Sequence, residues 1–465
     1  MFRKIQHIHF VGIGGAGMSG IAEVLLNLGY MVSGSDLNES EVIQQLRKTG
    51  GHITIGHSPS NIKGAQVVVI SSAVSPDNVE VVSARNASIP VIQRAEMLAE
   101  LMRLKYGIAV AGAHGKTTTT SIVASIIAAA GLDPTVVIGG KLNSLGSNAK
   151  LGQSEFLIAE ADESDGSFLK LSPTIAIVTN IDAEHLDYYQ NLENIKRTFL
   201  DFINKVPFYG VSILCADDKN IRSILPAVEK RHITYGIKNK ADIMATDIEL
   251  LHGKSSFRVL YKGMDMGMFD LPIPGIHNIS NALSGIGAAI ELDINIDDVK
   301  RALRDFSGVE RRFQIVGRID NPQDILVVDD YGHHPTEIRA TLSAAKAGWG
   351  RRTVVVFQPH RYTRTRDLLD EFAGAFDNAD ILLVTEIYPA GEKPVEGVSG
   401  EKLYKAIRDH GHKNVLFVPD RAAIHKYIKD IIMPEDMVIT LGAGDIWKVG
   451  REIIGNSNIK NQNEK

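Results

Sequence analysis

The sequence predicts an α/β protein of about three domains with mostly parallel sheets. Short runs rich in Val and Ile recur along the chain, among them Ile8–Ile13, Val67–Ile70, Ile108–Ala111 and Ile325–Val328. These runs are continuously apolar and do not alternate, which is typical of strands buried on both faces. Helical stretches separate many of them, and 465 residues fit this number of domains.

The remaining elements are expected in the same strand–helix order. No Pro- or Ser-rich linker marks a boundary, so we place the boundaries near residues 95–106 and 310–316. Further strands are predicted at Glu155–Ala159, Thr174–Thr179, Val211–Cys215, Thr353–Phe357, Ile381–Val384, Val415–Val418 and Met437–Leu441. Helices are predicted at Met18–Leu28, Ala95–Lys105, Thr117–Ala130, Thr336–Ala347 and Arg366–Phe376.

Polar residues stand at or just after the ends of several strands. Open α/β sheets bind ligands at the carboxyl ends of their strands, so these residues are binding-site candidates, although loops are polar in any case. The candidates are Gly14, His114, Glu160, Asn180, Asp329, Gln358, Thr385 and Gly442.

Composition excludes several classes of protein. With 50 Lys+Arg and 55 Asp+Glu the net charge is −5, which argues against a nucleic-acid partner. The one cysteine, Cys215, lies in an apolar run and is expected to be a buried, unreactive side chain. The longest nearly apolar run, Ile122–Leu132, is shorter than the roughly 20 residues of a membrane span. We expect a cytoplasmic enzyme without membrane insertion.

A glycine-rich motif, Gly12-Ile-Gly14-Gly15-Ala-Gly17, follows the first strand and opens a helix, and Asp36 ends the next strand. Such glycines let the backbone approach a pyrophosphate at the helix N-terminus. NAD is the first ligand to consider for such a motif, but a nucleotide-sugar diphosphate carries the same pyrophosphate group and would bind in the same way. The alternative is a tight strand-to-helix turn that binds no ligand.

A second loop, Gly112-Ala113-His114-Gly115-Lys116-Thr117-Thr118, also joins a strand to a helix. It is a shortened phosphate-binding loop, because Val110 stands where the strict pattern needs glycine. The backbone would cradle phosphates, Lys116 would reach the outer ones, and Thr117 would hold Mg²⁺.

Glu160 and His185 are candidate Mg²⁺ ligands near this loop. Taken singly, His185 is better explained as a loop histidine and Glu160 as a solvated loop carboxylate. Asp162, Glu163 and Asp165 beside Glu160 are expected to form a solvated loop, with a role as metal ligands as the less favoured alternative.

Two further clusters could bind small molecules. Asn278 and Asn281 open a helix, where they could read a purine or simply cap the helix. The segments Asp329–Pro335 and Gln358–Arg366 combine acids, histidines and arginines, which suit a zwitterion with its carboxylate on arginine. Since no Cys or spaced His pair accompanies the histidines, a zinc site is disfavoured.

Together these motifs resemble the Mur ligases, in the expected order over nearly the whole chain. The segments concerned are Gly12–Gly20, Gly112–Thr119, His277–Asn281, Arg311–Phe313 and Asp329–Glu337. The last of them and Phe357–Thr365 look most like the branch that adds L-alanine.

The resemblance implies a Rossmann-like domain for UDP-N-acetylmuramate (residues 1–100), a central P-loop-type ATPase domain (101–312) and a Rossmann-like amino-acid domain (313–465). It also implies that ATP and Mg²⁺ drive the joining of L-alanine to the lactyl carboxylate through an acyl phosphate, in peptidoglycan precursor synthesis. The nucleotide sugar would lie on Gly14, Gly15, Gly17, Met18, Ser19, Asp36 and Ser71.

By the same resemblance, the ATP site would comprise residues 112–118, Asn278 and Asn281, with Thr117, Glu160 and His185 as metal ligands. One arginine of Arg311–Arg312 and one aspartate of Asp329–Asp330 would contact the nucleotide, and we expect these to be Arg312 and Asp330. His333, Arg361 and Arg364 would line the alanine pocket, and His333 or a nearby carboxylate would be the base. Lys116, Glu160, His185 and His333 form the expected catalytic set.

The sequence departs from the family pattern at two points. Ala113 replaces the usual Thr, and no lysine stands near Leu200, where sister ligases carry a carboxylated lysine; Lys196 and Lys205 are nearest. The alternatives are a recycling ligase that adds a tripeptide to the same nucleotide sugar, a NAD-dependent oxidoreductase, and a non-catalytic nucleotide-binding regulator.

Overall fold

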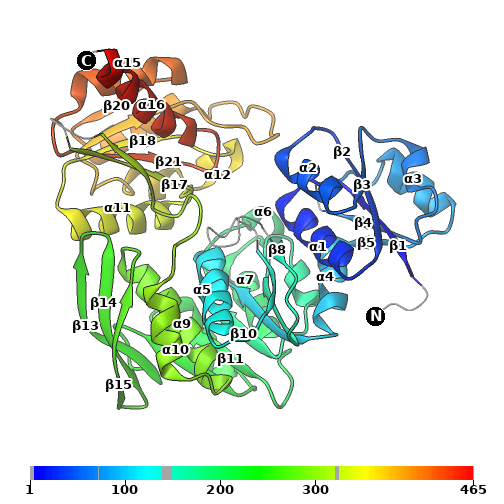
Figure 1. Cartoon of the computed structure of the whole chain (residues 1–465). Coiled ribbons are helices and arrows are strands. Elements are labelled where there is room, and N and C mark those ends of the chain that lie inside the picture. The colour runs from blue at the N-terminus through cyan, green and yellow to red at the C-terminus, as the bar shows by residue number, and fades with distance from the viewer. Residues whose placement is uncertain (1–4, 72, 139–148, 320–323, 464–465) are drawn as a thin grey trace. The chain divides into compact units, whose positions relative to one another are not determined.

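The computed structural model describes residues 5–71, 73–138, 149–319 and 324–463 (Figure 1). The chain forms two compact units, which we treat separately. The first comprises Met1–Asp247, Phe257–Asp270 and Ile279–Val309, and the second Ile248–Ser256, Leu271–Asn278 and Glu310–Lys465. Over the described residues, mostly parallel sheets alternate with helices, which confirms the predicted α/β class.

The N-terminal sheet of the first unit has the strand order β3-β2-β1-β4-β5, and all its pairs are parallel. The chain leaves β1 toward β2 and β3 and later returns on the other side to β4, so the carboxyl end of β1 lies at the point where the order reverses. The strands are β1 (His7–Val11), β2 (Met31–Asp36), β3 (His52–Ile55), β4 (Val67–Ile70) and β5 (Val91–Gln93). The helices are α1 (Ala16–Asn27), α2 (Glu41–Lys48), η1 (Pro59–Ile62), α3 (Val79–Asn86) and α4 (Arg94–Met102).

A second sheet has the order β15-β14-β13-β12-β11-β10-β6-β9-β7-β8. Its middle strands are parallel, and β8 is antiparallel at one edge. The strands are β6 (Tyr106–Ala111), β7 (Thr135–Val137), β8 (Ala149–Lys150), β9 (Phe156–Glu160), β10 (Ile175–Val178), β11 (Val211–Cys215), β12 (His232–Gly236), β13 (Ile243–Leu251), β14 (Lys254–Tyr261) and β15 (Met264–Leu271). The helices are α5 (Lys116–Ala129), η2 (Ser167–Lys170), α6 (Leu186–Tyr189), α7 (Leu192–Ile203), α8 (Lys219–Ile224), η3 (Leu225–Ala227), α9 (Ile276–Glu291) and α10 (Ile296–Arg304).

The strands β13, β14 and β15 form a meander that the sequence did not predict. The turns at His252-Gly253 and Lys262-Gly263 each hold two consecutive residues at positive φ, which is the backbone of a tight type I′ hairpin. These strands alternate buried and exposed residues along much of their length, so a search for continuous apolar runs passes over them.

The second unit contains a sheet of order β16-β17-β21-β18-β19-β20 that is parallel except for β16. Alternate residues of β17 enter different cores: Leu326 and Val328 share a core with residues of α11 and α14, and Ile325 and Val327 share one with residues of α15 and α16. The strands are β16 (Gln314–Ile319), β17 (Ile325–Asp330), β18 (Thr353–Phe357), β19 (Ile381–Val384), β20 (Val415–Phe417) and β21 (Met437–Leu441). The helices are α11 (Pro335–Trp349), α12 (Tyr362–Asp367), α13 (Leu369–Ala373), α14 (Gly400–His410), α15 (Arg421–Ile431) and α16 (Trp447–Asn463).

Two local predictions were wrong. The helix expected over Arg366–Phe376 is broken at Leu368 into α12 and α13. Asp329 does not follow its strand, because β17 continues through Asp330. Cys215 is buried at the end of β11, as expected, and burial raises the pKa of its thiol. Among the described residues, the helices are too short or too polar to cross a membrane.

Candidate active site

The loop between β6 and α5 has a backbone that only glycine tolerates at two positions. Gly112 has φ +135° and Gly115 has φ +83°. A Cβ atom would come within 2.1 Å of the Thr179 hydroxyl at Gly112 and within 2.6 Å of the Asn281 side-chain oxygen at Gly115. Both glycines are therefore required by left-handed backbone and by crowding.

Residues after β10 hold this loop in place. The His114 amide donates to Oδ1 of Asn180 at 2.8 Å, and the Asn180 side-chain amide donates to the His114 carbonyl at 2.9 Å. Thr179 donates to the same carbonyl at 2.6 Å. The loop conformation is thus set before any ligand binds, which is what a phosphate cradle needs.

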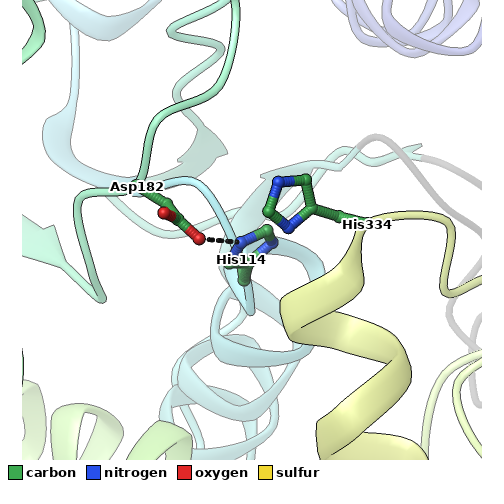
Figure 2. Close-up of side chains that lie close together, drawn as sticks. All are labelled: His114, Asp182 and His334. Carbon is green, nitrogen blue, oxygen red and sulfur yellow. Dashed lines mark hydrogen bonds and ion pairs between the residues drawn. The ribbon is translucent and has the colours of Figure 1, made fainter. Parts of the chain in front are cut away.

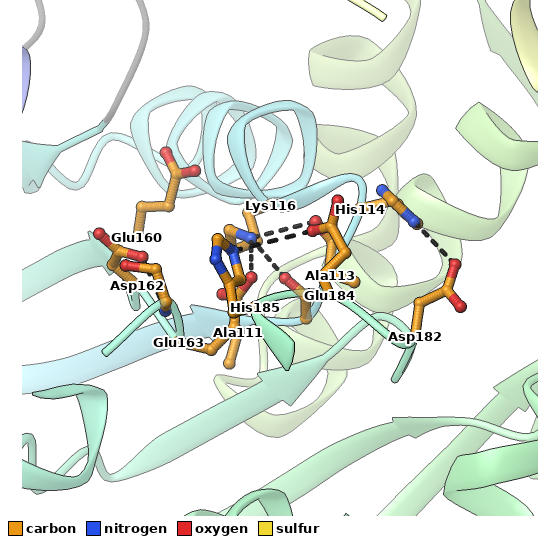
Figure 3. Close-up of polar contacts among 12 residues, drawn as sticks. Ala111, Ala113, His114, Lys116, Glu160, Asp162, Glu163, Asp182, Glu184 and His185 are labelled. Atoms are coloured by element: carbon orange, nitrogen blue, oxygen red, sulfur yellow. Dashed lines mark hydrogen bonds and ion pairs between the residues drawn. The ribbon is translucent and has the colours of Figure 1, made fainter. Parts of the chain in front are cut away.

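The Lys116 ammonium points into the loop (Figure 3). It donates to the carbonyls of Gly112 at 2.5 Å and Ala113 at 3.1 Å, and to Oε1 of Glu163 at 2.8 Å. Burial lowers the pKa of Lys116, but the carboxylates of Glu163 and Glu160 outweigh it and raise the pKa above its ordinary value. Lys116 is therefore a permanent cation at the position where outer phosphates would bind.

Thr117, in the first turn of α5, donates its hydroxyl to both oxygens of Glu160, at 3.1 and 3.2 Å. Glu160 is the last residue of β9, which pairs with β6 in parallel, so both side chains stand at the same edge of the sheet. Thr118, the next residue of α5, is buried. A hydroxyl and a carboxylate in contact are a donor set that suits Mg²⁺.

A second acidic cluster lies beside Lys116. The ligand atoms of Glu163, Glu184 and His185 are all within 4.8 Å of one another. The Glu163 side chain is only 5% exposed, so its assignment to a solvated loop was wrong. Burial raises the pKa of Glu163 to about 7, with Lys116 acting in the opposite direction. The cluster contains His185, one of the predicted metal ligands.

Nε2 of His114 lies within hydrogen-bond distance of Oδ2 of Asp182, at 3.1 Å (Figure 2). The close-up also draws His334, which belongs to the second unit and caps the N-terminus of α11. The Nδ1 atom of His334 accepts from the Thr336 amide at 3.3 Å.

The glycine motif after β1 makes a tight turn closed by β2. The amides of Gly12 and Ile13 donate to the Ser35 carbonyl, at 2.8 and 3.0 Å. The Gly14 amide donates to Oδ2 of Asp36 at 2.8 Å, so this predicted nucleotide-sugar-binding acid contacts the protein's own loop. A Cβ at Gly14 would lie 2.9 Å from the same oxygen.

The other predicted nucleotide-sugar residues lie around this turn. Gly15 is the N-cap residue of α1, and its carbonyl accepts from the amides of Met18 and Ser19, both at 2.9 Å. Gly17 stands in the first turn of α1 against the guanidinium of Arg94. Ser71 follows β4 directly, and its carbonyl accepts from the Val74 amide.

The two asparagines near the start of α9 have different environments. Asn278 does not cap the helix; it is its third residue and donates its side-chain amide to the Pro274 carbonyl at 2.7 Å. Asn281 lies one turn further along, against Gly115 of the phosphate loop.

In the second unit, the structure distinguishes the paired arginines and aspartates. Arg311 donates to Asp329 at 2.9 Å and to the Gly442 carbonyl at 2.6 Å. Asp330 is buried and accepts from the amides of Phe313 and Gly332, both at 2.7 Å. Burial raises the pKa of Asp330 to about 6, although Arg312 lowers it. Arg312 itself lies 3.5 Å from Glu337.

His333, Arg361 and Arg364 gather around His360. The rings of His333 and His360 are 5.6 Å apart edge to face, and Arg364 donates to Nδ1 of His360 at 3.4 Å. Arg361 precedes α12 with φ +72°, and its amide donates to the Tyr388 carbonyl at 2.9 Å. Burial lowers the pKa of His360 to about 3, assisted by His333 and the arginines, so its ring is neutral at pH 7.

Three family models match consecutive parts of the chain. They are described as "Mur ligase family, catalytic domain" (residues 7–106), "Mur ligase middle domain" (110–289) and "Mur ligase, glutamate ligase domain" (311–444). The chain belongs to the Mur ligase family. It is therefore a ligase with the three-domain architecture of that family.

Known proteins and solved structures are similar to this Mur ligase over nearly its whole length. The UDP-N-acetylmuramate–L-alanine ligases of Geotalea uraniireducens and Geobacter sulfurreducens are 60% and 59% identical, over 98% of both chains in each case. The crystal structure of the UDP-N-acetylmuramate–alanine ligase of Thermotoga maritima matches with TM-score 0.82 and 31% identity, covering 99% of this chain and 100% of that one. A murein peptide ligase from Psychrobacter arcticus matches with TM-score 0.70 and 25% identity, over 97% and 98% of the chains.

Sequence reasoning missed several residues that shape the site of this Mur ligase. Glu184 was not singled out, Asn180 was noted only as a strand-end residue, and Arg94 was not considered. Because Glu184 directly precedes the candidate metal ligand His185, its position in the sequence could have identified it as a further candidate. Arg94 carried no such signal, because its partners Gly17 and Asp162 are far away in sequence.

Proposed function

We propose that this Mur ligase joins L-alanine to the lactyl carboxylate of UDP-N-acetylmuramate with consumption of ATP. The observation that carries the proposal is identity of 57–60% over at least 97% of the chain with proteins named UDP-N-acetylmuramate–L-alanine ligase. The reaction class fits the geometry of the first unit, where a preformed loop, a buried lysine and two groups of acids surround one edge of a sheet.

ATP and Mg²⁺ are the cosubstrate and metal that this site fits. The loop 112–116 would hold the phosphates, with Lys116 moving from Glu163 and the loop carbonyls to the transferred group. Thr117 with Glu160, and His185 with Glu163 and Glu184, offer the oxygen-rich sets that bind Mg²⁺. The metal, when bound, neutralises the charge of the phosphates. A structure of a different Mur ligase, from Thermotoga maritima, holds ADP.

The carboxylate of the nucleotide sugar must be activated before an amine can attack it. Transfer of the γ-phosphoryl group gives an acyl phosphate, and attack by the alanine amine through a tetrahedral intermediate expels phosphate. Lys116 stabilises charge during the first step. In the second unit, Arg361 and Arg364 would hold the alanine carboxylate, and His333 would accept the amine proton.

For the nucleotide contact from the second unit, we propose Arg312, because Arg311 is held by Asp329 and by the Gly442 carbonyl. Asp330 fixes the backbone of Phe313 and Gly332, so its contribution would be to position the loop that bears Arg312.

The test is phosphate release from ATP with UDP-N-acetylmuramate and Mg²⁺, adding L-alanine, the tripeptide or nothing. Release that requires L-alanine supports the proposal, and Lys116→Ala should lower it at least about 1,000-fold. Lys240→Ala is the matched control, since Lys240 is exposed and lies outside the loop. No release with either acceptor would refute the proposal.

The second candidate is the tripeptide-adding branch. Solved structures named murein peptide ligase and UDP-N-acetylmuramate:L-alanyl-gamma-D-glutamyl-meso-diaminopimelate ligase match at 25% and 28% identity. The alanine ligases of Geotalea and Geobacter match at 60% and 59%. Release with the tripeptide alone would move the chain to that branch. The oxidoreductase alternative is disfavoured, because it leaves Lys116, Glu163 and the second unit without a role.

A further inference from the structure

We infer that Asp445 is a positioning residue of the amino-acid site, which acts through the side chain of Gln358 on the loop that bears Arg361 and Arg364. The inference deepens the proposed function and rests on it, because it takes these two arginines to hold the alanine carboxylate. Asp445 is far from both arginines in the sequence, so no motif connects them.

Gln358 and Asp445 follow two neighbouring strands of the second unit. The strands β18 and β21 pair in parallel, with Phe357 opposite Leu441, so the segments that follow them leave the sheet at the same carboxyl edge. The Gln358 backbone amide donates to the Leu441 carbonyl at 3.0 Å. The loop that bears the arginines therefore starts beside the loop after β21, to which Asp445 belongs.

Asp445 binds both polar atoms of the Gln358 side chain. Nε2 of Gln358 donates to Oδ1 of Asp445 at 3.1 Å, and the Asp445 backbone amide donates to Oε1 of Gln358 at 3.0 Å. Gln358 is only 8% exposed. Because a buried amide without a partner costs free energy, loss of the Asp445 carboxylate would leave a donor of Gln358 unpaired or force the side chain to move.

Gly444 shows how closely the two loops approach each other. It has no left-handed φ, so its contacts and not its backbone explain the absence of a side chain. A Cβ there would lie 2.3 Å from Oε1 of Gln358 and 2.8 Å from Cγ of Tyr388. The segment that ends in Asp445 thus packs directly against Gln358 and against the ring of Tyr388.

Tyr388 connects this packing to the arginine-bearing loop. Its carbonyl accepts from the Arg361 amide at 2.9 Å, and its ring stacks on His360 with centroids 5.7 Å apart. Arg361 has φ +72°, a backbone conformation that a residue with a side chain keeps only where its surroundings hold it. A shift of Gln358 after loss of Asp445 would therefore displace the guanidinium groups that are to meet the alanine carboxylate.

The other oxygen of the Asp445 carboxylate belongs to an ion network on the surface. Nη1 of Arg421 donates to Oδ2 of Asp445 at 2.6 Å. Arg421 lies 4.0 Å from Glu452, which also pairs with His425 at 2.7 Å. Glu452 is 44% exposed and two links away from the Gln358 amide, so it provides a matched control.

The experiment measures phosphate release by full-length variants while each substrate is varied in turn. Asp445→Ala should raise the KM for L-alanine at least about tenfold and change the KM for ATP and for UDP-N-acetylmuramate less than about twofold, because only the amino-acid loop loses its support. Gln358→Leu keeps the volume of the side chain, removes its amide and should have the same effect. Glu452→Ala should leave all three KM values within about twofold of wild type.

The double variant Asp445→Ala/Gln358→Leu tests whether one residue acts through the other. Its KM for L-alanine should rise no further than the larger of the two single effects, and effects that multiply would overturn the inference. A pair that only stabilises the fold would lower the urea midpoint and kcat with an unchanged KM for L-alanine, which also overturns it. Equal rises in all three KM values do the same. A wild-type protein without alanine-dependent phosphate release would instead overturn the proposed function.

Discussion

Glu80, in the first turn of α3, is a fully buried carboxylate with several hydrogen-bond partners around the N-terminal sheet. His9 lies 3.0 Å away, Ser35 donates at 2.7 Å, and Asn61 donates at 2.6 Å. Burial raises the pKa of Glu80, but these donors outweigh it and lower the pKa to about 2. Since the Ser35 carbonyl also closes the glycine turn, this network positions the turn that would bind the nucleotide sugar.

Replacing Glu80 with Gln should destabilise the first unit by about 3 kcal/mol at pH 7, because the charge that the surrounding donors stabilise is lost. The matched control is Glu39→Gln, whose exposed ion pair with Arg47 is worth less than about 1 kcal/mol. Urea denaturation of both variants measures the difference, and equal midpoints would contradict the role of the network.

Glu80 should also contribute to acid sensitivity. Its folded pKa of about 2 lies below the ordinary value of 4.5, so its stabilising contribution is complete above pH 4.5 and is lost as the pH falls toward 2. Melting temperatures measured between pH 7 and pH 3 should therefore fall less steeply in Glu80→Gln than in wild type. The same slope in both proteins would show that other groups cause the acid sensitivity.

The strand–loop–helix units could be predicted from the sequence, because continuous apolar runs and the spacing of glycines are local patterns. The loop before α5 and its lysine were predicted on this basis. The surroundings of Lys116 were not, since Glu163 looks like one of several solvated acids until folding buries it. The β13–β15 meander was missed for a related reason: its half-exposed strands lack the apolar run that identifies a buried strand.

Gly115 and Gly131 stand at opposite ends of α5 and allow two effects to be separated. Both have positive φ, but a Cβ at Gly115 would meet Asn281 at 2.6 Å, whereas Gly131 has nothing within 4 Å. Gly131→Ala should cost about 1 kcal/mol of stability for its left-handed backbone, and Gly115→Ala should cost more, because the added Cβ must also displace the Asn281 side chain. Only Gly115→Ala should also raise the KM for ATP, by at least about tenfold, because the cradle must shift. Steady-state kinetics with both variants tests this, and an equal rise in KM would contradict it.

Binding of a nucleotide should raise the free energy of unfolding of the protein. A non-hydrolysable ATP analogue with Mg²⁺, at about 100 times its Kd, should stabilise the protein by about 2.7 kcal/mol. The shift in melting temperature should vanish in Lys116→Ala and persist in Lys240→Ala. A full shift in the absence of Lys116 would mean that the nucleotide binds elsewhere.

The buried thiol at the end of β11 offers a use that has nothing to do with catalysis. Cys215 is the only cysteine of the chain and is 5% exposed, so a thiol reagent can modify the native protein only when this part of the sheet opens. The labelling rate would therefore report local opening in the unmodified enzyme, without an engineered probe. Because β11 pairs with β10, which leads into the Thr179–Asn180 support of the phosphate loop, nucleotide should slow that labelling.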